Sequence, residues 1–562
     1  MMDFQRPVLI VAIAAVSLML LVEWNKFQQV HKPVQANAEQ IANTESPALS
    51  DTPATPVTNT SEAPAAPDAV TAAAAPTSAT FDAAKIIDVY SDKLHLKIDT
   101  EGGDIVMAAL RDYPAKINEP EHPFVVLTRT NTNTYIAQSG LIGDNGIDKG
   151  NERPKYIAQQ TRYDLAENAE TLVVDLQLAD TTGANIIKRY TLQRGEHLVQ
   201  VSYVVKNTTQ QPWSAYFYGQ IKRDTHQPVS TGGAIGISPF LGGATTTAEK
   251  NYLKMSFSDM AKEPLKEKRT GGWIAMVQHY FVSAWIPDAA AANSFFTKHD
   301  EKNDMYFLGF TGPRMEVAPG AEASVGAQFY VGPKDVKRLE KLAPYLDLTV
   351  DYGVLWWIAK PLFALTHWIH SLVGNWGLAI IGLTLCVKAI FLWPSALSYR
   401  SMAVMKKLAP KMQEMKEAYG DNPNKLREEM FKLYQKEKAN PMLGCLPMII
   451  QTPVFIALYW SLMESVELRQ APFYGWIVDL SVQDPYFVLP ILMGISMWVQ
   501  QKLNPPAADP MQQKVFQWMP IIFTGMFLFF PAGLVLYMLV NNLISMSHQF
   551  WVYRSLEKAQ AK

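Results

Sequence analysis

The chain has 562 residues and a formal net charge of −2, so no overall basic field points to nucleic acid. Hydrophobic residues make up 48% and charged residues 18%. An average soluble chain holds about 25% charged residues, which indicates that part of this chain is solvated by lipid. A Gly-rich phosphate loop, His-Glu-x-x-His and Cys-x-x-Cys are all absent from the sequence, so we expect no nucleotide motor, no metal site and no cofactor.

The chain begins with a short apolar run and a biased segment. We interpret residues 1–25 as an uncleaved transmembrane anchor. A cleavable signal is the alternative, because Ala36-Asn37-Ala38 resembles a cleavage site, although it lies well beyond the apolar run. Residues 26–80 are rich in Pro, Ala, Thr and Ser, and we expect a disordered tether, since such a composition buries too little apolar area to offset its conformational entropy.

From residue 81 to 350 the pattern has a period of two. Leu94, Leu96 and Ile98 alternate with polar residues, and many similar short runs are separated by Gly, Pro and Asn turns. This pattern predicts a large antiparallel β-sandwich. Residues 353–372 then mix Trp and Phe with Lys and His, which is typical of an amphipathic helix lying in the membrane interface; an ordinary core helix is the alternative.

Residues 373–554 contain the remaining apolar spans. Residues 376–397, 441–463 and 485–501 each form one span. Residues 515–553 are 39 residues without a charge, roughly twice the length needed to cross a hydrocarbon core, so this stretch must fold back, with Pro531 at the turn. Together with the anchor, the sequence predicts six transmembrane helices, five of them forming a core, in an α-helical polytopic membrane protein.

Loop charges predict the orientation of the chain. Residues 400–438 hold ten Lys or Arg against six acids, residues 464–484 hold one Arg against four acids, and the short tail, 555–562, is basic. The positive-inside rule places the 400–438 loop and both termini in the cytoplasm. The β-sandwich then lies in the periplasm, outside the inner membrane.

Lys388 is the residue that most needs an explanation. It is the single charge in the middle of its span, and a lysine there costs about 2.5–3.5 kcal/mol. One interpretation is that the side chain snorkels to an interface. A mid-span position is explained better by a water-filled groove in which the positive charge binds an anionic partner. Other polar residues interrupt the same or later spans and would line that groove: Thr384, Gln451, Thr452, Asn541, Asn542 and Ser545.

Residues 400–438 are predicted to form a cytoplasmic helical hairpin. Methionines recur in it at helical spacing, and most of them are expected to form the seam between its two arms. The functional alternative is that polarizable Met side chains adapt to varied hydrophobic clients. The methionines concerned are Met402, Met405, Met412, Met415 and Met430.

Several long motifs resemble those of the YidC family of membrane protein insertases, namely Asn440 to Pro447, Gln451 to Phe455, Glu467 to Phe473, Asp509 to Lys514 and Phe530 to Tyr537. The resemblance implies an insertase and chaperone that is no enzyme. Its partners would be nascent membrane proteins, the Sec translocon with its accessory subunits, the ribosome and lipid, with no small-molecule substrate. It also implies that the β-sandwich is a supersandwich akin to sugar-mutarotase folds.

The resemblance assigns residues too. It implies a groove with Lys388 as its positive residue and Thr384 and Tyr537 nearby, beside a hydrophobic slide to which Phe455, Phe516 and Phe523 belong. Two features depart from the family pattern. The groove residue is Lys where Arg is usual, and a lysine can lose its proton where arginine does not. The tail is short, which predicts only weak ribosome binding.

Two other functions compete with this interpretation. A membrane transporter would usually show inverted repeats and several intramembrane carboxylates, and neither is visible in the sequence. A membrane-tethered carbohydrate enzyme would rest on the β-sandwich alone, and fold analogy is a weak argument for activity.

Overall fold

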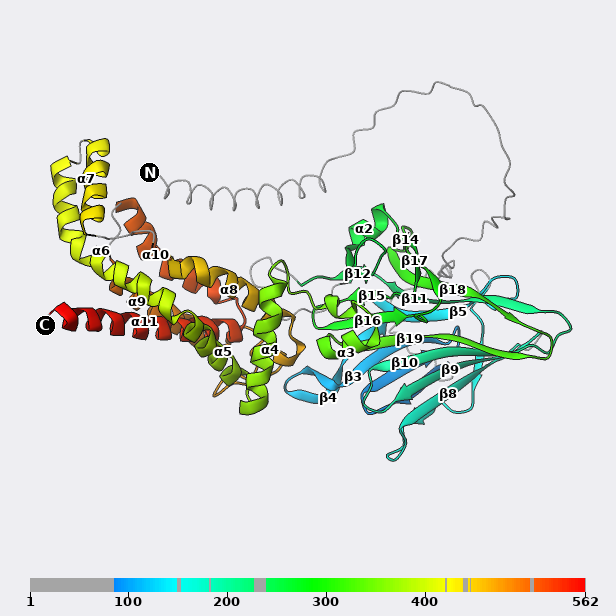
Figure 1. The fold of residues 1–562 in the computed structure, drawn as a ribbon. Coiled ribbons are helices and arrows are strands. Elements are labelled where there is room, and N and C mark those ends of the chain that lie inside the picture. The colour runs from blue at the N-terminus through cyan, green and yellow to red at the C-terminus, as the bar shows by residue number, and fades with distance from the viewer. Residues whose placement is uncertain are drawn as a thin grey trace, which may run out of the picture.

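The computed structural model describes residues 85–148, 153–180, 183–226, 239–419, 422–437, 443–444, 446–505 and 510–560. The predicted anchor (1–25) and tether (26–80) lie outside the described residues, as do residues 81–84 and the last two residues of the tail. A β-domain with two sheets is followed by a helical region, and the two parts lie end to end (Figure 1).

Two sheets form the β-domain. The strands of the first sheet, in spatial order, are β14 (Lys266–Thr270), β17 (Ala292–Asp300), β18 (Met305–Val317), β11 (Trp213–Arg223), β5 (Thr134–Ile142), β4 (Glu119–Arg129), β3 (Asp104–Lys116), β2 (Leu94–Asp99), β1 (Ile86–Tyr90) and β7 (Arg162–Asp164). Those of the second are β13 (Leu253–Met255), β12 (Gly242–Thr245), β15 (Ile274–Val277), β16 (Phe281–Ile286), β19 (Glu322–Pro333), β10 (Leu198–Lys206), β9 (Asn185–Gln193), β8 (Thr171–Leu178) and β6 (Tyr156–Ala158).

The predicted sandwich is confirmed, with one correction to its antiparallel pattern. Strand β7 pairs with β1 in the parallel direction, with Val89 opposite Tyr163. The open edge of β1 explains this pairing, because an unpaired edge is satisfied by any short segment that covers it. The predicted alternation holds, since Leu94, Leu96 and Ile98 are all fully buried in the core between the sheets.

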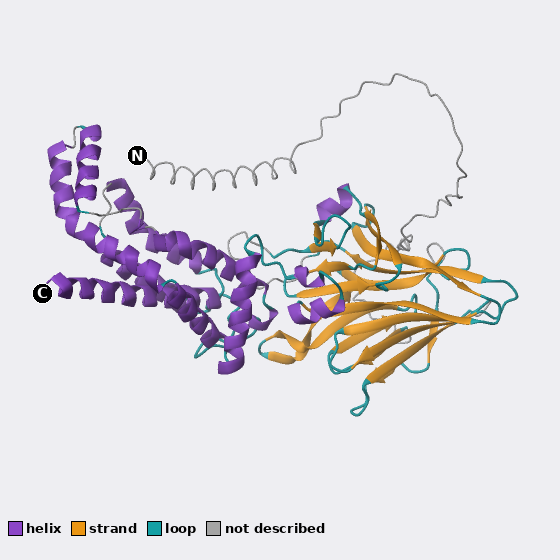
Figure 2. Ribbon diagram, in the orientation of Figure 1, coloured by secondary structure: helices purple, strands orange, loops and turns teal. Residues whose placement is uncertain are grey.

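The helical region runs from α4 to α11 (Figure 2). Its members are α4 (Trp356–Val373), α5 (Trp376–Ile390), α6 (Leu392–Tyr419), α7 (Pro423–Lys436), α8 (Leu446–Glu464), η3 (Val466–Leu468), α9 (Val488–Leu503), α10 (Pro510–Phe527) and α11 (Ala532–Gln560). Three short helices belong to the β-domain and its exit: α2 (Phe257–Lys262), α3 (Val336–Leu342) and η1 (Leu346–Thr349).

The span predicted over 376–397 is broken. Helix α5 ends at Ile390, α6 begins at Leu392, and the two axes are bent by 68°. Pro394 explains the break, because it has no N–H to donate to the carbonyl of Ile390 and its ring crowds that carbonyl. The bend lets α6 leave the core and become the first arm of the hairpin, with α7 as the second. The turn predicted at Pro531 lies where expected, between α10 and α11.

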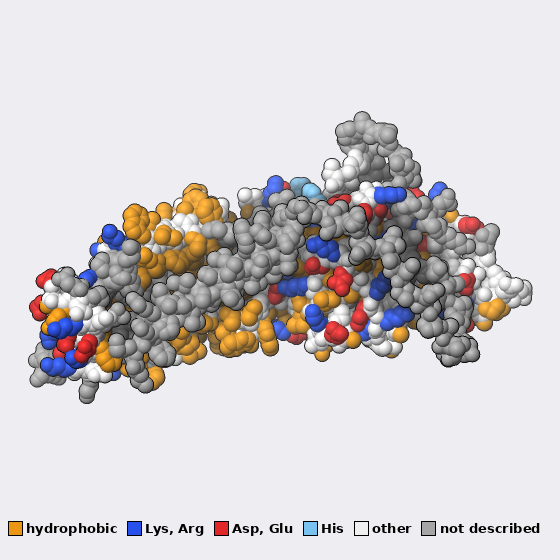
Figure 3. All heavy atoms as spheres, turned by 90° about the horizontal axis from the view of Figure 1, so that it is seen from above, with side chains coloured by type: hydrophobic (Ala, Val, Ile, Leu, Met, Phe, Trp, Pro, Cys, Tyr) orange, Lys and Arg blue, Asp and Glu red, His pale blue; other side chains and the backbone are white. Residues whose placement is uncertain are grey.

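By length and composition, one helix of the described part of the chain, α8, can cross a membrane by itself, and α5 with α6 passes as one bent span. Helix α9 has 16 residues, fewer than the roughly 20 that a hydrocarbon core requires. The total of six spans therefore stays a prediction. Hydrophobic side chains gather over the helical region, whereas acidic and basic side chains are mixed over the β-domain (Figure 3).

The β-domain and the helical region meet at a buried contact that we call the joint, made of His279, Lys334, Met463, Glu464 and Arg469. Lys334 forms an ion pair with Glu464, and their side chains are only 2% and 3% exposed. The Nε2 atom of His279 donates to the carbonyl of Met463 at 2.7 Å. Burial lowers the pKa of His279 to about 3, which keeps its ring neutral.

Arg469 holds the other side of the joint. It donates to the carbonyls of Pro114 and Ala115 at 2.8 and 3.2 Å. Its guanidinium also lies 5.1 Å from the ring centre of Phe124 and 5.7 Å from that of Phe281, within cation–π range. The end of α8 is thus fixed to the β-domain through charge, hydrogen bonds and ring contacts.

Candidate functional site

The ammonium of Lys388 bridges three helices. Its Nζ atom, from α5, donates to Oε1 of Gln451 in α8 at 3.0 Å and to Oγ of Ser545 in α11 at 2.8 Å. Both partners are neutral, so they solvate the positive charge without cancelling it. The side chain is only partly buried and is directed inward to the other helices, in contrast to a lysine that snorkels.

Gln451 is oriented by a second hydrogen bond. Its Nε2 atom donates to the hydroxyl of Tyr537 at 2.7 Å. Because the amide nitrogen faces Tyr537, the amide oxygen is left to face Lys388. The structure thus brings together four of the predicted groove residues, Lys388, Gln451, Tyr537 and Ser545.

The other predicted groove residues have different surroundings. Thr384 is buried one turn before Lys388 and donates to the carbonyl of Ile380 at 2.7 Å. Asn541 is buried, and its Oδ1 atom has no hydrogen-bond partner among the described residues. Thr452 is exposed and donates to the carbonyl of Met448 at 2.8 Å, so the structure does not bring it to Lys388.

Ser545, which the sequence already places among the polar residues of the groove, donates no hydrogen bond to Lys388 but accepts one from it. A sequence signal for this role exists. Tyr537, Asn541 and Ser545 are spaced by four residues, which places them on one face of a helix. The spacing alone does not show that this face of the helix packs against α5.

The aromatic residues of the predicted slide lie on two helices. Phe455 of α8 and Phe523 of α10 both have their ring centres 6.2 Å from that of Phe527. Phe516 is 40% exposed and lies two turns before Phe523 on α10. Phe527, which has no distinguishing signal in the sequence, is buried and connects α10 to α8 through its contact with Phe455.

The hairpin is built from α6 and α7. The hydroxyl of Tyr434 in α7 lies 3.8 Å from the sulfur of Met412 in α6, and Lys411 pairs with Glu437 across the two arms at 3.4 Å. Met412 therefore faces the seam. The other four predicted methionines, Met402, Met405, Met415 and Met430, are all partly buried.

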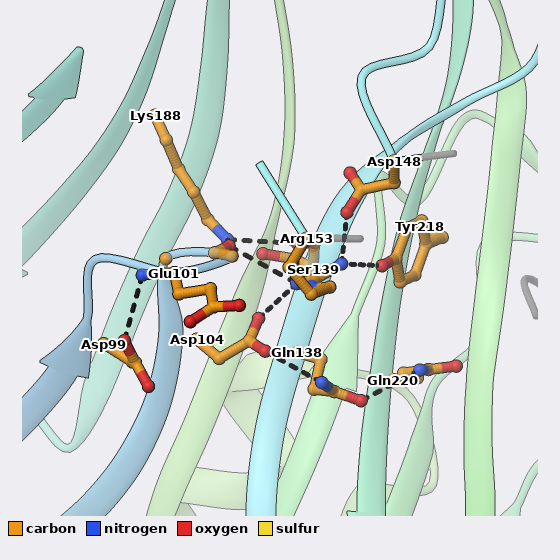
Figure 4. Close-up of polar contacts among 12 residues, drawn as sticks. Asp99, Glu101, Asp104, Gln138, Ser139, Asp148, Arg153, Lys188, Tyr218 and Gln220 are labelled. Carbon is orange, nitrogen blue, oxygen red and sulfur yellow. Dashed lines mark hydrogen bonds and ion pairs between the residues drawn. The ribbon is translucent and has the colours of Figure 1, made fainter. Parts of the chain in front are cut away.

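A second group of charges lies inside the β-domain (Figure 4). Lys188 of β9, in the second sheet, donates to the carbonyls of Gly102 and Ser139 at 3.0 Å each, and Ser139 belongs to the first sheet. Arg153 forms ion pairs with Asp104 and Asp148. Two cations and two carboxylates are thus buried together.

This group fits a structural role better than a catalytic one. Lys188 is fully buried and donates to two backbone carbonyls, while Arg153 donates to the carboxylates of Asp104 and Asp148. Burial lowers the pKa of Lys188 to about 7. We regard the group as a polar cross-link between the two sheets. Within the described residues, no set of three His, Cys, Asp or Glu is placed to hold a metal ion.

Two family matches cover most of the chain. Residues 86–365 match the family described as YidC periplasmic domain, and residues 368–559 match the family described as 60Kd inner membrane protein. The chain belongs to the YidC family. A YidC relative from Cellvibrio japonicus, named membrane protein insertase YidC, is 51% identical over the full length of both chains. Another of the same name, from Stutzerimonas stutzeri, is 48% identical over 99% of each.

Solved structures include a YidC protein as well. A crystal structure described as an active YidC insertase with the first transmembrane domain resolved covers 82% of this chain and 92% of its own, with 16% identity and a TM-score of 0.36. That TM-score is too low to carry a structural argument. YidC membership makes the chain an inner-membrane protein with a periplasmic domain, and it does not favour the transporter alternative.

Proposed function

We propose that this chain is a membrane protein insertase whose working site is a hydrated groove around Lys388. The observation that carries the proposal is a partly exposed ammonium held among α5, α8 and α11 by two neutral acceptors, Gln451 and Ser545. An ammonium has three N–H groups, and the two acceptors engage two of them. The third is free to meet the carboxylate of a client.

Buried polar atoms near the groove support its hydration. Two of them, Asn541 Oδ1 and Gln549 Oε1, lie one turn to either side of Ser545 on α11 and have no hydrogen-bond partner among the described residues. Buried polar atoms are usually satisfied by protein or water, and leaving one unsatisfied costs about 1–3 kcal/mol. Water in the groove would satisfy them and would also keep Lys388 solvated. Thr384 and Tyr537 would line the same groove, as would Thr452 near its edge.

The hydrophobic half of a client takes a different route in this proposal. Its apolar segment slides along Phe455, Phe516 and Phe523 into lipid, and burial of roughly 20 apolar residues supplies the driving force. Helix α10 supports this route, because Phe516 and Trp518 are 40% and 61% exposed. The membrane potential assists an anionic segment by about 2.3 kcal/mol per charge per 100 mV. No covalent bond changes, so we propose no enzymatic activity.

The proposed arrangement in the membrane has six spans, with both termini and the hairpin in the cytoplasm, as the loop charges favour. Helix α4 lies in the outer interface of the bilayer. Exposed Trp356, Trp357 and Trp368 on α4 support that position, because indole rings are enriched at membrane interfaces. We propose domain limits at 25, 80, 350, 372 and 554, with hairpin 400–438 inside the core.

We propose that the partners are nascent membrane proteins, lipid, the Sec translocon with its accessory subunits, and the ribosome. Beside the translocon the protein would act as a chaperone. The lysines of the hairpin and tail would bring the ribosome near through weak electrostatic contacts. The hairpin methionines that are partly exposed would meet hydrophobic clients first.

The test replaces Lys388 in cells depleted of the native protein and measures insertion of a single-span client with an acidic translocated segment. Lys388→Arg should restore insertion, Lys388→Ala should lower it about tenfold, the worth of one charged hydrogen bond, and Lys388→Glu should lower it further. Lys502→Glu, a charge reversal at the exposed end of α9, is the matched control. Full rescue by Lys388→Glu would refute the electrostatic mechanism.

Deleting residues 81–346 distinguishes the insertase function from that of a carbohydrate enzyme. An enzyme built on the β-domain loses all activity with that deletion. The insertase keeps most of its insertion activity, because Lys388, Gln451 and Ser545 all lie in the helical region.

A further inference from the structure

Ser545 is built into the site as an acceptor. Its side chain is 5% exposed, and its Oγ atom donates to the carbonyl of Asn541 at 2.7 Å. With its only proton engaged there, the hydroxyl oxygen offers lone pairs to Nζ of Lys388 at 2.8 Å. Gln451 is the second acceptor, at 3.0 Å, and we call Gln451 and Ser545 the clamp.

A clamp of this kind has a consequence for a lysine that it does not have for an arginine. Low-polarity surroundings disfavour the charged form of a lysine, and hydrogen bonds accepted from that charged form favour it. Arginine stays charged in almost any surroundings. The clamp therefore acts together with the water of the groove to keep the lysine of this chain charged, a task that does not arise with arginine.

The groups around Lys388 leave this task to the clamp. On α11 the titratable side chains facing it are Tyr537, whose hydroxyl is engaged by Gln451, and His548. On α6 it is Tyr399, whose side chain lies against Ser545 and whose ring meets that of His548 with centres 5.2 Å apart. Helix α4 packs on the opposite end of α5, where His370 stacks on Trp376. These neighbours supply no anion to hold the proton.

We propose that Ser545, acting with Gln451, is a positioning residue that keeps the Lys388 ammonium protonated and directs its third N–H to the client's carboxylate. The inference rests on the proposed function, because it requires that a charge at Lys388 drives insertion. Ser545 itself touches no client; it acts through the ammonium.

The test measures insertion by the purified full chain in liposomes between pH 7 and 9.5. The client is a single-span protein with two aspartates in its translocated segment, and protease protection of that segment is the readout. Ser545→Ala should move the alkaline loss of insertion down by about one pH unit, so that at the pH where the unmodified chain keeps half of its insertion the variant keeps about a tenth.

Three controls make the result specific. Ser547→Ala removes the same atom from an exposed serine of α11, whose hydroxyl donates to the carbonyl of Leu543, and should leave the profile unchanged. Ser545→Thr keeps the hydroxyl and should also leave it unchanged. In a Lys388→Arg background, Ser545→Ala should have no effect on the profile, because arginine needs no clamp to stay charged.

Two outcomes overturn the inference: a Ser545→Ala profile that matches Ser547→Ala, or a shift that persists with arginine at position 388. If Ser545→Ala does not fold, Ser545→Cys decides, because it keeps the volume and replaces oxygen with a weak acceptor, so the same downward shift is expected. Full insertion by Lys388→Ala at every pH would refute the proposed function instead. Loss of insertion in Lys388→Ala with an unmoved Ser545→Ala profile refutes only the clamp.

Discussion

Replacing Lys334 with Met should weaken the attachment of the β-domain to the helical region. The ammonium of Lys334 pairs with Glu464 and also lies 3.4 Å from the carbonyl of Thr349, and the two charged side chains are almost fully buried. Removing the ammonium leaves a carboxylate buried without its cation. Breaking one partner of such a pair costs about 3–5 kcal/mol.

The double variant separates the cost of an unpaired charge from the value of the pair. Lys334→Met with Glu464→Met replaces both charges with apolar side chains of similar volume, which is usually neutral or stabilising. The single variants should therefore both be less stable than the double variant. Their interaction free energy should exceed the roughly 0.3–0.5 kcal/mol deviation seen between independent sites.

The stabilities of the single and double variants can be measured by thermal unfolding of the full chain in detergent, followed by tryptophan fluorescence. Each 1 kcal/mol moves the midpoint by roughly 2–4 °C in a domain of 150–250 residues, so each single variant should unfold roughly 6 °C or more below the unmodified chain. Lys116→Met is the control, since its partner is Glu119 and their side chains are 72% and 43% exposed; it should cost under about 1 kcal/mol. A double variant as unstable as the sum of its singles would refute the reasoning.

Three further predictions concern other sites. Burial lowers the pKa of Lys188 from 10.5 to about 7. Between these two values the unfolded chain binds more protons than the folded chain, so the stability of the β-domain should rise with pH. Lys188→Met should remove this rise in thermal unfolding measured from pH 7 to 9.5, and an unchanged slope would contradict the prediction. Asp484, just before α9, accepts hydrogen bonds from two backbone N–H groups and one indole N–H at 2.8–3.0 Å. Asp484→Ala should therefore lower the free energy of unfolding by about 1–3 kcal/mol in the same thermal unfolding experiment. An unshifted midpoint would show that these bonds are dispensable. Gly377→Ala would place a Cβ 2.0 Å from the ring of Phe473, so it should lower the yield of folded protein in gel filtration, with Gly525→Ala, where the space is open, as the control.

Elements with a local signal follow from the sequence alone. Leu94, Leu96 and Ile98 alternate with polar residues, and this period of two is enough to predict a strand with one buried face. The charge-free length of 515–553 requires a turn, and Pro531 marks it. Lys388 also stands out locally, because a charge in an apolar run is costly wherever the neighbouring helices lie.

Contacts between distant segments were decided only by the tertiary structure. Gln451 and Thr452 are adjacent and equally polar, yet one reaches Lys388 and the other is exposed, because successive residues of a helix point about 100° apart and only packing decides which direction is inward. Ser545 lies 157 residues from Lys388, and Lys334 lies 130 residues from Glu464. Periodicity determines which side chains share a face of a helix or strand. It does not determine which face meets which, since that depends on how the whole chain buries its apolar surface and pairs its buried charges.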